Sequence, residues 1–177
     1  YAVPVIKAVA ANGKLKAVAF GYACHPTVLD IYQFSGDYPG FAQIELENAH
    51  PGVIALFFQG AAGDQNPLPR RTISLARQYG RELAAAVDRV LEEPMQPLLA
   101  QLQMAYSEIT LPLSTPPTEA ELIKTQSETT PYLKRWATRT LAEMKQGKPF
   151  LSSYSYPLQI WKLGDQPLFS FGGELVI

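Results

Sequence analysis

Two short apolar runs, each followed by a segment with a helical pattern, constrain the fold of this chain more than any other feature. Residues 14–23 (KLKAVAFGYA) form the first run and residues 53–59 (VIALFFQ) form the second. Short continuous apolar runs are typical of strands that are buried on both faces. Residues 37–49 and 72–92 carry the helical patterns. The order strand, helix, strand, helix predicts a layered α/β domain.

Both helices are predicted from capping residues and from the spacing of apolar positions. Ser35 or Asp37 can cap the first helix, and Pro39 suits its first turn. The apolar positions expected on one face are Phe41, Ile44 and Ala49 in the first helix, and Ala76, Tyr79, Leu83, Val87, Val90 and Leu91 in the second.

The remaining segments add hairpins at both ends of the chain. Asn12-Gly13 lies between two apolar runs and is a strong hairpin signal. The other expected elements are a strand at 98–111, a short helix capped by Thr118, a helix at 132–147, and a strand pair at 154–163 and 166–173. The fold class is therefore α/β, with a mixed β-sheet packed by helices.

We expect residues 1–177 to form a single domain, and the abrupt ends of the chain suggest a piece of a longer protein.

Charge, cysteine content and hydropathy exclude several classes of protein. The formal net charge is −1 over 177 residues and the basic residues are scattered, so we expect no nucleic-acid partner. Cys24 is the single cysteine, which excludes an internal disulfide and a multi-cysteine zinc cluster. No apolar run approaches the roughly 20 residues that a membrane-spanning helix needs.

His25 lies at the end of the first apolar run, in the stretch GYACHPTVLD. Pro26 favours an extended backbone at His25, and ligands of open α/β sheets bind beyond the carboxyl ends of the strands. His25 can therefore belong to a site, and a hydrogen-bonded core histidine is the alternative. Neighbouring strand residues point to opposite faces, so Cys24 should not meet His25 and is interpreted as a small buried thiol.

Two further segments place polar groups after apolar runs. The loop GAAGDQNP contains Gly63 and Asp64, and such loops can bring backbone N–H groups close to a ligand or an oxyanion. An ordinary turn has the same composition. Glu174 follows LFSFGG, and a carboxylate at the end of a core strand needs a partner. A metal ligand, a salt-bridge partner and a chain-end effect are the alternatives for Glu174, whereas His50 is interpreted as an exposed turn residue.

A zinc site is one physical interpretation that joins these residues. His25 and Glu174 both follow predicted core strands, and imidazole and carboxylate ligands suit a catalytic zinc ion. Such sites use at least three protein ligands. The remaining ligands would have to come from outside residues 1–177.

Four motifs give the chain a resemblance to a known family. They are GYACHPTVL, SGDYPGFAQIELE, VIALFFQGAAGDQNP and LFSFGGEL, and they all lie within residues 21–177. In content and order they resemble the neutral/alkaline (non-lysosomal) ceramidase family. Catalytic domains of that family are zinc-dependent amidases that hydrolyse the N-acyl bond of ceramide. The resemblance implies that this chain is an incomplete piece of a ceramidase-like catalytic domain.

The resemblance also implies roles for individual residues. His25 in the H-P-T motif corresponds to a zinc-binding histidine, and Glu174 in the G-E motif corresponds to a zinc-binding glutamate. The other ligands of the family lie in an upstream and a downstream segment, outside residues 1–177. The implied cofactor is Zn²⁺ and the implied substrate is a lipid amide. Contact with a membrane surface and a secreted, periplasmic or membrane-associated location are implied as well.

One position departs from the family pattern. Family members carry G-D-x-S-P, with a serine proposed to act beside the zinc, whereas this chain has Asn66 at that position. An asparagine amide can donate a hydrogen bond to an oxyanion, but it cannot act as a hydroxyl nucleophile. A metal-activated water could still attack the substrate. The candidate catalytic residues are therefore Asn66, Asp64 and Gly63.

Three interpretations follow. The first is a zinc-dependent amidohydrolase that hydrolyses ceramide or a related lipid amide. The second is a catalytically inactive ceramidase-like domain that binds a lipid or a glycan, because the serine is missing. The third is a structural α/β domain of an unrelated protein, in which His25 is a core histidine.

Overall fold

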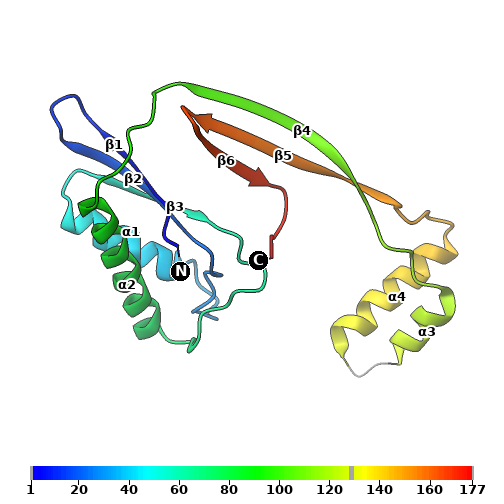
Figure 1. Cartoon of the computed structure of the whole chain (residues 1–177). Coiled ribbons are helices and arrows are strands. Elements are labelled where there is room, and N and C mark those ends of the chain that lie inside the picture. Colours follow the sequence, from blue (N-terminus) through cyan, green and yellow to red (C-terminus); the bar gives the residue numbers. More distant parts are fainter. Residues whose placement is uncertain (1, 128–129, 177) are drawn as a thin grey trace. The chain divides into compact units, whose positions relative to one another are not determined.

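The computed structural model describes residues 2–127 and 130–176, which divide into two compact units. Unit 1 comprises Tyr1–Leu99 and Gly173–Ile177, and unit 2 comprises Ala100–Gly172. Figure 1 shows the elements of both units. Unit 1 contains β1 (Val5–Val9), β2 (Leu15–Tyr22), α1 (Asp37–Ala49), β3 (Ile54–Gln59) and α2 (Ile73–Glu92). Unit 2 contains β4 (Leu102–Pro112), α3 (Glu119–Gln126), α4 (Pro131–Lys145), β5 (Ser153–Leu163) and β6 (Gln166–Phe171).

The sheet of unit 1 is mixed, with β2 at its centre. β1 runs antiparallel to β2, and β3 runs parallel to it. In the parallel pair, Tyr22 at the end of β2 lies opposite Gln59 at the end of β3. The carboxyl ends of both strands therefore reach the same edge of the sheet. This arrangement confirms the predicted α/β class with a mixed sheet packed by helices.

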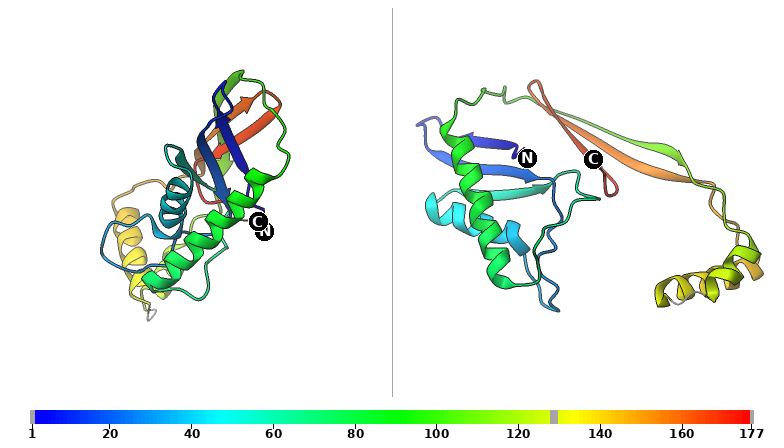
Figure 2. Two further views of the ribbon diagram at one scale, coloured as in Figure 1. Left: turned by 90° about the vertical axis from the view of Figure 1, so that its left-hand side faces the viewer. Right: turned by 60° about the horizontal axis from the view of Figure 1, so that its bottom comes forward.

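Helices α1 and α2 lie on the same face of this sheet, as Figure 1 and Figure 2 show. Val18 and Phe20 of β2 are fully buried in the core that the two layers share. The rings of Phe20 and Phe57 meet edge to face, with 5.6 Å between their centroids. The Thr72 side chain caps α2 by accepting a hydrogen bond from the N–H of Leu75 at 3.1 Å.

The other face of the sheet differs from the expectation of strands buried on both sides. Ile54 and Leu56 of β3 are 59% and 52% exposed, whereas Ala55 between them is buried. Among the described residues, β3 is an edge strand and the helices cover one face only. The prediction of a second fully buried strand is therefore wrong, because a sheet covered on one side buries alternate residues.

The predicted buried face of α1 is also wrong in part. Ile44 is 54% exposed, whereas Ala42 and Leu46 are buried. Positions four apart lie on one face of a helix, so Tyr38, Ala42 and Leu46 form the face that packs into the core. The N-cap position is held by Gly36, which has no side chain to cap the helix. Ser35 Oγ nevertheless accepts a hydrogen bond from the N–H of Asp37, the first residue of the helix, at 3.0 Å.

Close packing of α1 against α2 depends on Gly80. A Cβ atom at Gly80 would lie 2.5 Å from Phe41 Cβ and 2.9 Å from the carbonyl oxygen of Tyr38. Overpacking costs about 1–3 kcal/mol, and the gain in helix propensity returns at most about 1 kcal/mol. We therefore expect Gly80→Ala to lower the free energy of unfolding, measured by urea denaturation followed by far-UV circular dichroism.

Gly40→Ala is the matched control for this prediction. Gly40 also lies in a helix, α1, but a Cβ atom there would meet no atom within 4 Å. This variant should be neutral or slightly stabilising, because it gains helix propensity without a clash. Equal stability changes in the two variants would contradict the account of Gly80.

Unit 2 contains an antiparallel sheet in the order β4–β5–β6 and a pair of helices. β4 and β5 pair along their whole length, from Leu102 opposite Leu163 to Pro112 opposite Ser153. α3 begins with a capping box that Thr118 forms with the third residue of the helix, as its sequence predicts. The two helices share a small core of their own, formed by Leu122, Ala137 and Leu141 with Trp136 and Met144 beside it.

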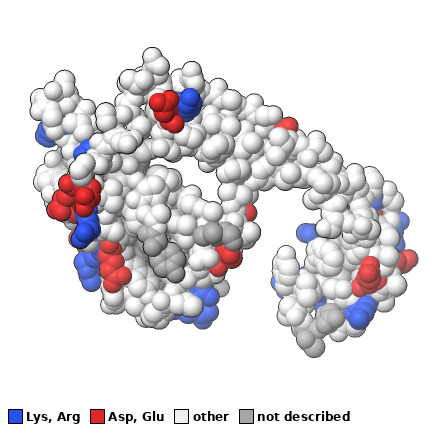
Figure 3. Space-filling model, in the orientation of Figure 1, with Lys and Arg blue, Asp and Glu red and all other residues white. Residues whose placement is uncertain are grey.

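The strands of unit 2 expose large apolar side chains. Every residue of β4 is exposed, and Trp161 and Phe169 are 45% and 55% exposed. The only charged residues of these strands are Glu108 and Lys162, and Figure 3 shows few charged side chains along them on the face drawn. The expectation that LFSFGG is a core strand is wrong for the described residues, because β6 pairs only with β5 and remains exposed.

Within the part of the chain that the structure describes, no helix is long and apolar enough to cross a membrane.

Candidate metal centre and adjoining loop

The ends of β2 and β3 bring together the two polar segments that the sequence singles out. His25 follows β2, and the loop of residues 60–70 follows β3. The N–H of His25 donates to the carbonyl oxygen of Gln65 at 2.9 Å, and the N–H of Gly60 donates to that of Tyr22 at 3.0 Å. As predicted, both segments leave the same edge of the sheet.

The imidazole of His25 lies between a backbone carbonyl group and a carboxylate. Nδ1 lies 3.0 Å from the carbonyl oxygen of Gln65, and Nε2 lies 3.3 Å from Oε1 of Glu174. The His25 side chain is 22% exposed and the Glu174 side chain is 76% exposed. The structure thus brings together the two residues that the zinc interpretation pairs, although 149 positions of sequence separate them.

The surroundings of His25 favour a positive charge at Nε2. The hydrogen bond to Gln65, and then the one to Glu174, raise the pKa of His25 above its ordinary value. A carbonyl oxygen can only accept, so Nδ1 carries a proton and Nε2 of the neutral ring is an acceptor. Nε2 would then face another acceptor, the Glu174 carboxylate. The contact is favourable when the ring takes up a second proton or when a cation lies between the two groups.

The donor types of this pair fit zinc, but two donors do not complete a site. A zinc-ligating histidine usually donates its other ring N–H to a carbonyl or carboxylate, as Nδ1 of His25 does to Gln65. A carboxylate oxygen such as that of Glu174 is a common further ligand. Among residues 2–127 and 130–176, no group of three or more His, Cys, Asp or Glu side chains could hold a metal ion. A zinc ion bound at this point would need additional ligands.

Asn66 is held by two donors from its own surroundings. Its Oδ1 accepts hydrogen bonds from Thr27 Oγ1 at 3.2 Å and from a guanidinium nitrogen of Arg70 at 3.4 Å. Because the carbonyl end of the amide is engaged, the NH₂ end is the one that can donate to a ligand. The side chain is exposed, so a ligand can reach it.

Gly63 joins the loop to the segment that carries Glu174. Its N–H donates to the carbonyl oxygen of Leu175 at 2.6 Å. A Cβ atom at Gly63 would lie 2.9 Å from that oxygen and 3.0 Å from Cγ1 of Val176. Glycine therefore permits the close approach that places Glu174 beside His25, and its N–H serves this contact. Asp64, the third candidate of the loop, is exposed at the next position.

Two other interpretations from the sequence need correction. Cys24 is only half-buried, and burial, followed by the charge of Asp37, raises the pKa of its thiol. The sequence predicts that His50 is an exposed turn residue, but His50 is half-buried. Its Nε2 lies 2.7 Å from Oδ1 of Asp88, and its side chain is 35% exposed. The packing of α1 against α2 brings this pair together, which sequence spacing alone does not reveal.

Sequence reasoning missed two buried residues that fix the backbone around His25. Asp37 is 6% exposed, and its carboxylate accepts hydrogen bonds from the N–H groups of Val28 and Leu29 at 3.2 and 2.8 Å. Tyr38 is 3% exposed, and its hydroxyl donates to the carbonyl oxygen of Cys24 at 2.6 Å. An acidic residue at a helix start is typical of an exposed cap, so the sequence carries no signal for this role.

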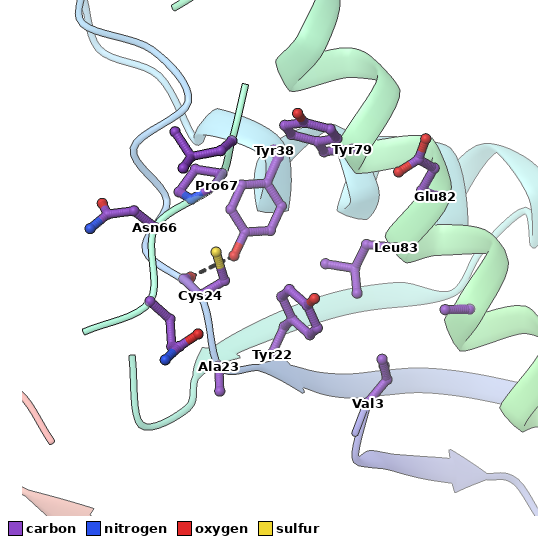
Figure 4. Close-up of a pocket in the computed structure, with 13 residues that line it drawn as sticks. Val3, Tyr22, Ala23, Cys24, Tyr38, Asn66, Pro67, Tyr79, Glu82 and Leu83 are labelled. Carbon is purple, nitrogen blue, oxygen red and sulfur yellow. Dashed lines mark hydrogen bonds between the residues drawn. The ribbon is translucent and has the colours of Figure 1, made fainter. Parts of the chain in front are cut away.

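A cavity of about 520 Å³ adjoins the loop. Its walls include the rings of Tyr22, Tyr38 and Tyr79, as Figure 4 shows, and Cys24 and Asn66 border it on the loop side. The volume falls in the range of small-molecule pockets, and walls of aromatic and apolar groups with a few polar ones are typical of such pockets. Asn66 therefore lies at the margin of a space that can hold part of an organic ligand, and its amide points away from the three tyrosine rings (Figure 4).

Two solved ceramidase structures are similar to this chain. The crystal structure of neutral ceramidase from Pseudomonas aeruginosa aligns with a TM-score of 0.63 and 17% sequence identity, over 94% of this chain and 33% of that chain. A ceramidase complexed with C2 aligns with a TM-score of 0.64 and 16% identity, over 94% of this chain and 35% of that one. At these identities the likeness establishes the fold. The chain spans about a third of the length of the proteins it matches.

No family model and no curated protein sequence matches the chain.

Proposed function

We propose that this chain is part of the catalytic domain of a zinc-dependent amidohydrolase that hydrolyses the N-acyl bond of ceramide or a related lipid amide. The ceramidase-like fold supports the proposal. The observation that carries it is the 3.3 Å contact between Nε2 of His25 and Oε1 of Glu174. The contact supports the proposal because histidine and glutamate are both common zinc ligands, and because a second hydrogen bond orients the histidine.

The remaining zinc ligands would come from segments outside residues 1–177. The chain spans about a third of its structural neighbours, which supports the view that it is a piece of a larger domain. His25 and Glu174 would then supply two of the ligands.

The residues of this chain have distinct roles in the proposed reaction. Zinc, when bound, would polarise the substrate carbonyl group and lower the pKa of a water molecule. The Gln65 carbonyl keeps the proton on Nδ1 of His25, so that the lone pair of Nε2 would be available to a metal ion. The NH₂ group of Asn66 would donate a hydrogen bond to the oxygen of the scissile carbonyl group as negative charge develops on it. Thr27 and Arg70 orient that amide through Oδ1.

We expect Asn66→Ala to lower kcat for a zinc-dependent N-acyl hydrolysis about 100-fold, the usual loss when one oxyanion donor is removed. The assay uses the full-length protein with a fluorescent ceramide, with and without a zinc chelator. Asn48→Ala is the control, because Asn48 is an exposed residue of α1. If the zinc-loaded protein hydrolyses no N-acyl lipid, the enzymatic function is wrong.

The second candidate function is binding without catalysis. It is favoured by Asn66, which has no hydroxyl group to act as a nucleophile, and by the cavity beside it. A ceramidase-like domain of this kind would bind a lipid or a glycan and release it unchanged. Binding of ceramide without turnover by the zinc-loaded protein would favour this function over hydrolysis.

We also propose that the protein contacts a membrane surface and is secreted, periplasmic or membrane-associated. The exposed aromatic residues of β5 and β6, including Trp161 and Phe169, support the contact with a membrane surface. Tryptophan and other aromatic side chains are favoured at the boundary between lipid and water.

A further inference from the structure

We propose that Asp37 and Tyr38 at the start of α1, the Asp37–Tyr38 pair, are positioning residues for His25. They bond to the backbone on both sides of that histidine. The inference deepens the proposed function, because it says what sets the geometry of one of the two zinc ligands. Its structural part, the placement of the His25 ring, does not depend on the metal.

The backbone before His25 is fixed by the phenol of Tyr38. The hydroxyl of Tyr38 donates to the carbonyl oxygen of Cys24 at 2.6 Å, the contact drawn as a dashed line in Figure 4. Nε2 of Gln59 donates to the same oxygen at 3.0 Å. The Tyr38 ring is held edge to face between Tyr22 and Phe57, at centroid distances of 6.5 and 6.4 Å. The hydroxyl therefore has little freedom to move away from Cys24.

The backbone after His25 is fixed by the carboxylate of Asp37. Its two oxygens accept hydrogen bonds from the N–H groups of Val28 and Leu29, and Oδ1 also lies 2.7 Å from the N–H of Tyr38. Asp37 itself has a φ of 50°, in the left-handed region that only a few residue types adopt readily. In this conformation the carboxylate accepts hydrogen bonds both from the preceding loop and from the first turn of the helix.

His25 lies on a short and bent segment between two anchors, which are the backbone groups held by Tyr38 and by Asp37. One anchor is the carbonyl of Cys24, directly before His25, and the other begins at Val28, three residues after it. The N–H of Thr27 donates to the carbonyl oxygen of His25 at 2.9 Å, so the segment turns tightly between the anchors. A shift at either anchor is therefore transmitted to the imidazole.

The test compares Tyr38→Phe with Tyr79→Phe. Both tyrosines line the cavity, and each donates to a backbone carbonyl, that of Cys24 for Tyr38 and that of Pro69 for Tyr79. Phenylalanine keeps the ring and removes only the hydroxyl. The readouts on the full-length protein are the NMR resonances of the His25 ring without metal, hydrogen exchange of the His25 amide, and zinc affinity.

We expect Tyr38→Phe to shift the ring resonances of His25, to speed exchange of its amide about fivefold, and to weaken zinc binding about tenfold. Tyr79→Phe should change none of these. The resonances of His50, which bonds to Asp88 outside this segment, report that the fold is intact. Gln59→Leu removes the second donor to the Cys24 carbonyl, so it provides an independent perturbation that should shift His25 as well.

Unchanged His25 resonances in both Tyr38→Phe and Gln59→Leu would overturn the positioning role. Equal changes from Tyr38→Phe and Tyr79→Phe would also overturn it, because the effect would then be general loosening of the cavity. If the His25 ring moves in Tyr38→Phe while the unaltered protein binds no zinc, the positioning role stands and the proposed zinc function fails.

Discussion

Replacing His25 with alanine is expected to weaken zinc binding by the full-length protein by more than about 100-fold and to abolish zinc-dependent hydrolysis. Loss of a residue that merely supports a metal ligand costs about 10–100-fold in affinity, and loss of a ligand should exceed that. The alanine variant keeps the Glu174 carboxylate but removes Nε2, which lies 3.3 Å from it. Competition with a chromophoric chelator measures the affinity.

His50→Ala is the control for His25→Ala, because these are the two histidines of the chain. His50 bonds to Asp88 between the helices of unit 1 and takes no part in the candidate metal centre. Its replacement should leave zinc affinity unchanged. Glu174→Gln should weaken binding as well, since the amide that replaces the carboxylate carries no charge. Stoichiometric zinc of undiminished affinity in His25→Ala would refute the assignment of this residue.

Asp37→Ala is expected to lower the free energy of unfolding of unit 1 by about 4 kcal/mol or more. The Asp37 carboxylate accepts hydrogen bonds from three backbone N–H groups, those of Val28, Leu29 and Tyr38. Each buried donor left without a partner costs about 1–3 kcal/mol. Alanine at a φ of 50° adds about 1–2 kcal/mol of backbone strain. The loss should therefore greatly exceed that of an ordinary surface substitution.

Two comparisons separate the causes of this loss. Asp37→Asn tolerates the left-handed conformation and keeps one acceptor oxygen, so it should lose less stability than Asp37→Ala. Asp30→Ala removes a carboxylate from the same loop that is 59% exposed and 3.6 Å from Arg71, so it should change stability by less than about 1 kcal/mol. Far-UV circular dichroism is the suitable probe, because both tryptophans, Trp136 and Trp161, lie in unit 2. Equal losses in Asp30→Ala and Asp37→Ala would contradict the account.

The type and order of the elements could be predicted because their signals are local. Asn12-Gly13 lies between the paired strands β1 and β2, and Thr118 caps α3. Apolar spacing identified α2 as a helix over almost its observed length. Boundaries of strands were less accurate, since the strand expected from residue 98 begins at Leu102.

Burial and long-range contacts could not be predicted, because they depend on which elements pack together. The apolar run of β3 gives no sign that Ile54 and Leu56 face away from the helices. The sequence suggests the pairing of His25 with Glu174 because both residues follow predicted core strands and because both match motifs of the family. The strand that precedes Glu174, β6, nevertheless belongs to the exposed sheet of unit 2 and is not a core strand. The role of Asp37 depends on a chain reversal that places Val28 and Leu29 beside the start of α1, and no sequence period encodes it.

The path of the chain has a consequence for variation among related proteins. The polypeptide leaves unit 1 after Leu99 and returns at Gly173, one residue before Glu174. The entropy lost in closing a long flexible loop depends only on the logarithm of its length, so doubling the length costs about 0.6 kcal/mol. Natural relatives could therefore lengthen or shorten the irregular connection of residues 113–117, between β4 and α3, without losing the contact between His25 and Glu174. The same connection is a suitable place to insert a fluorescent or affinity tag.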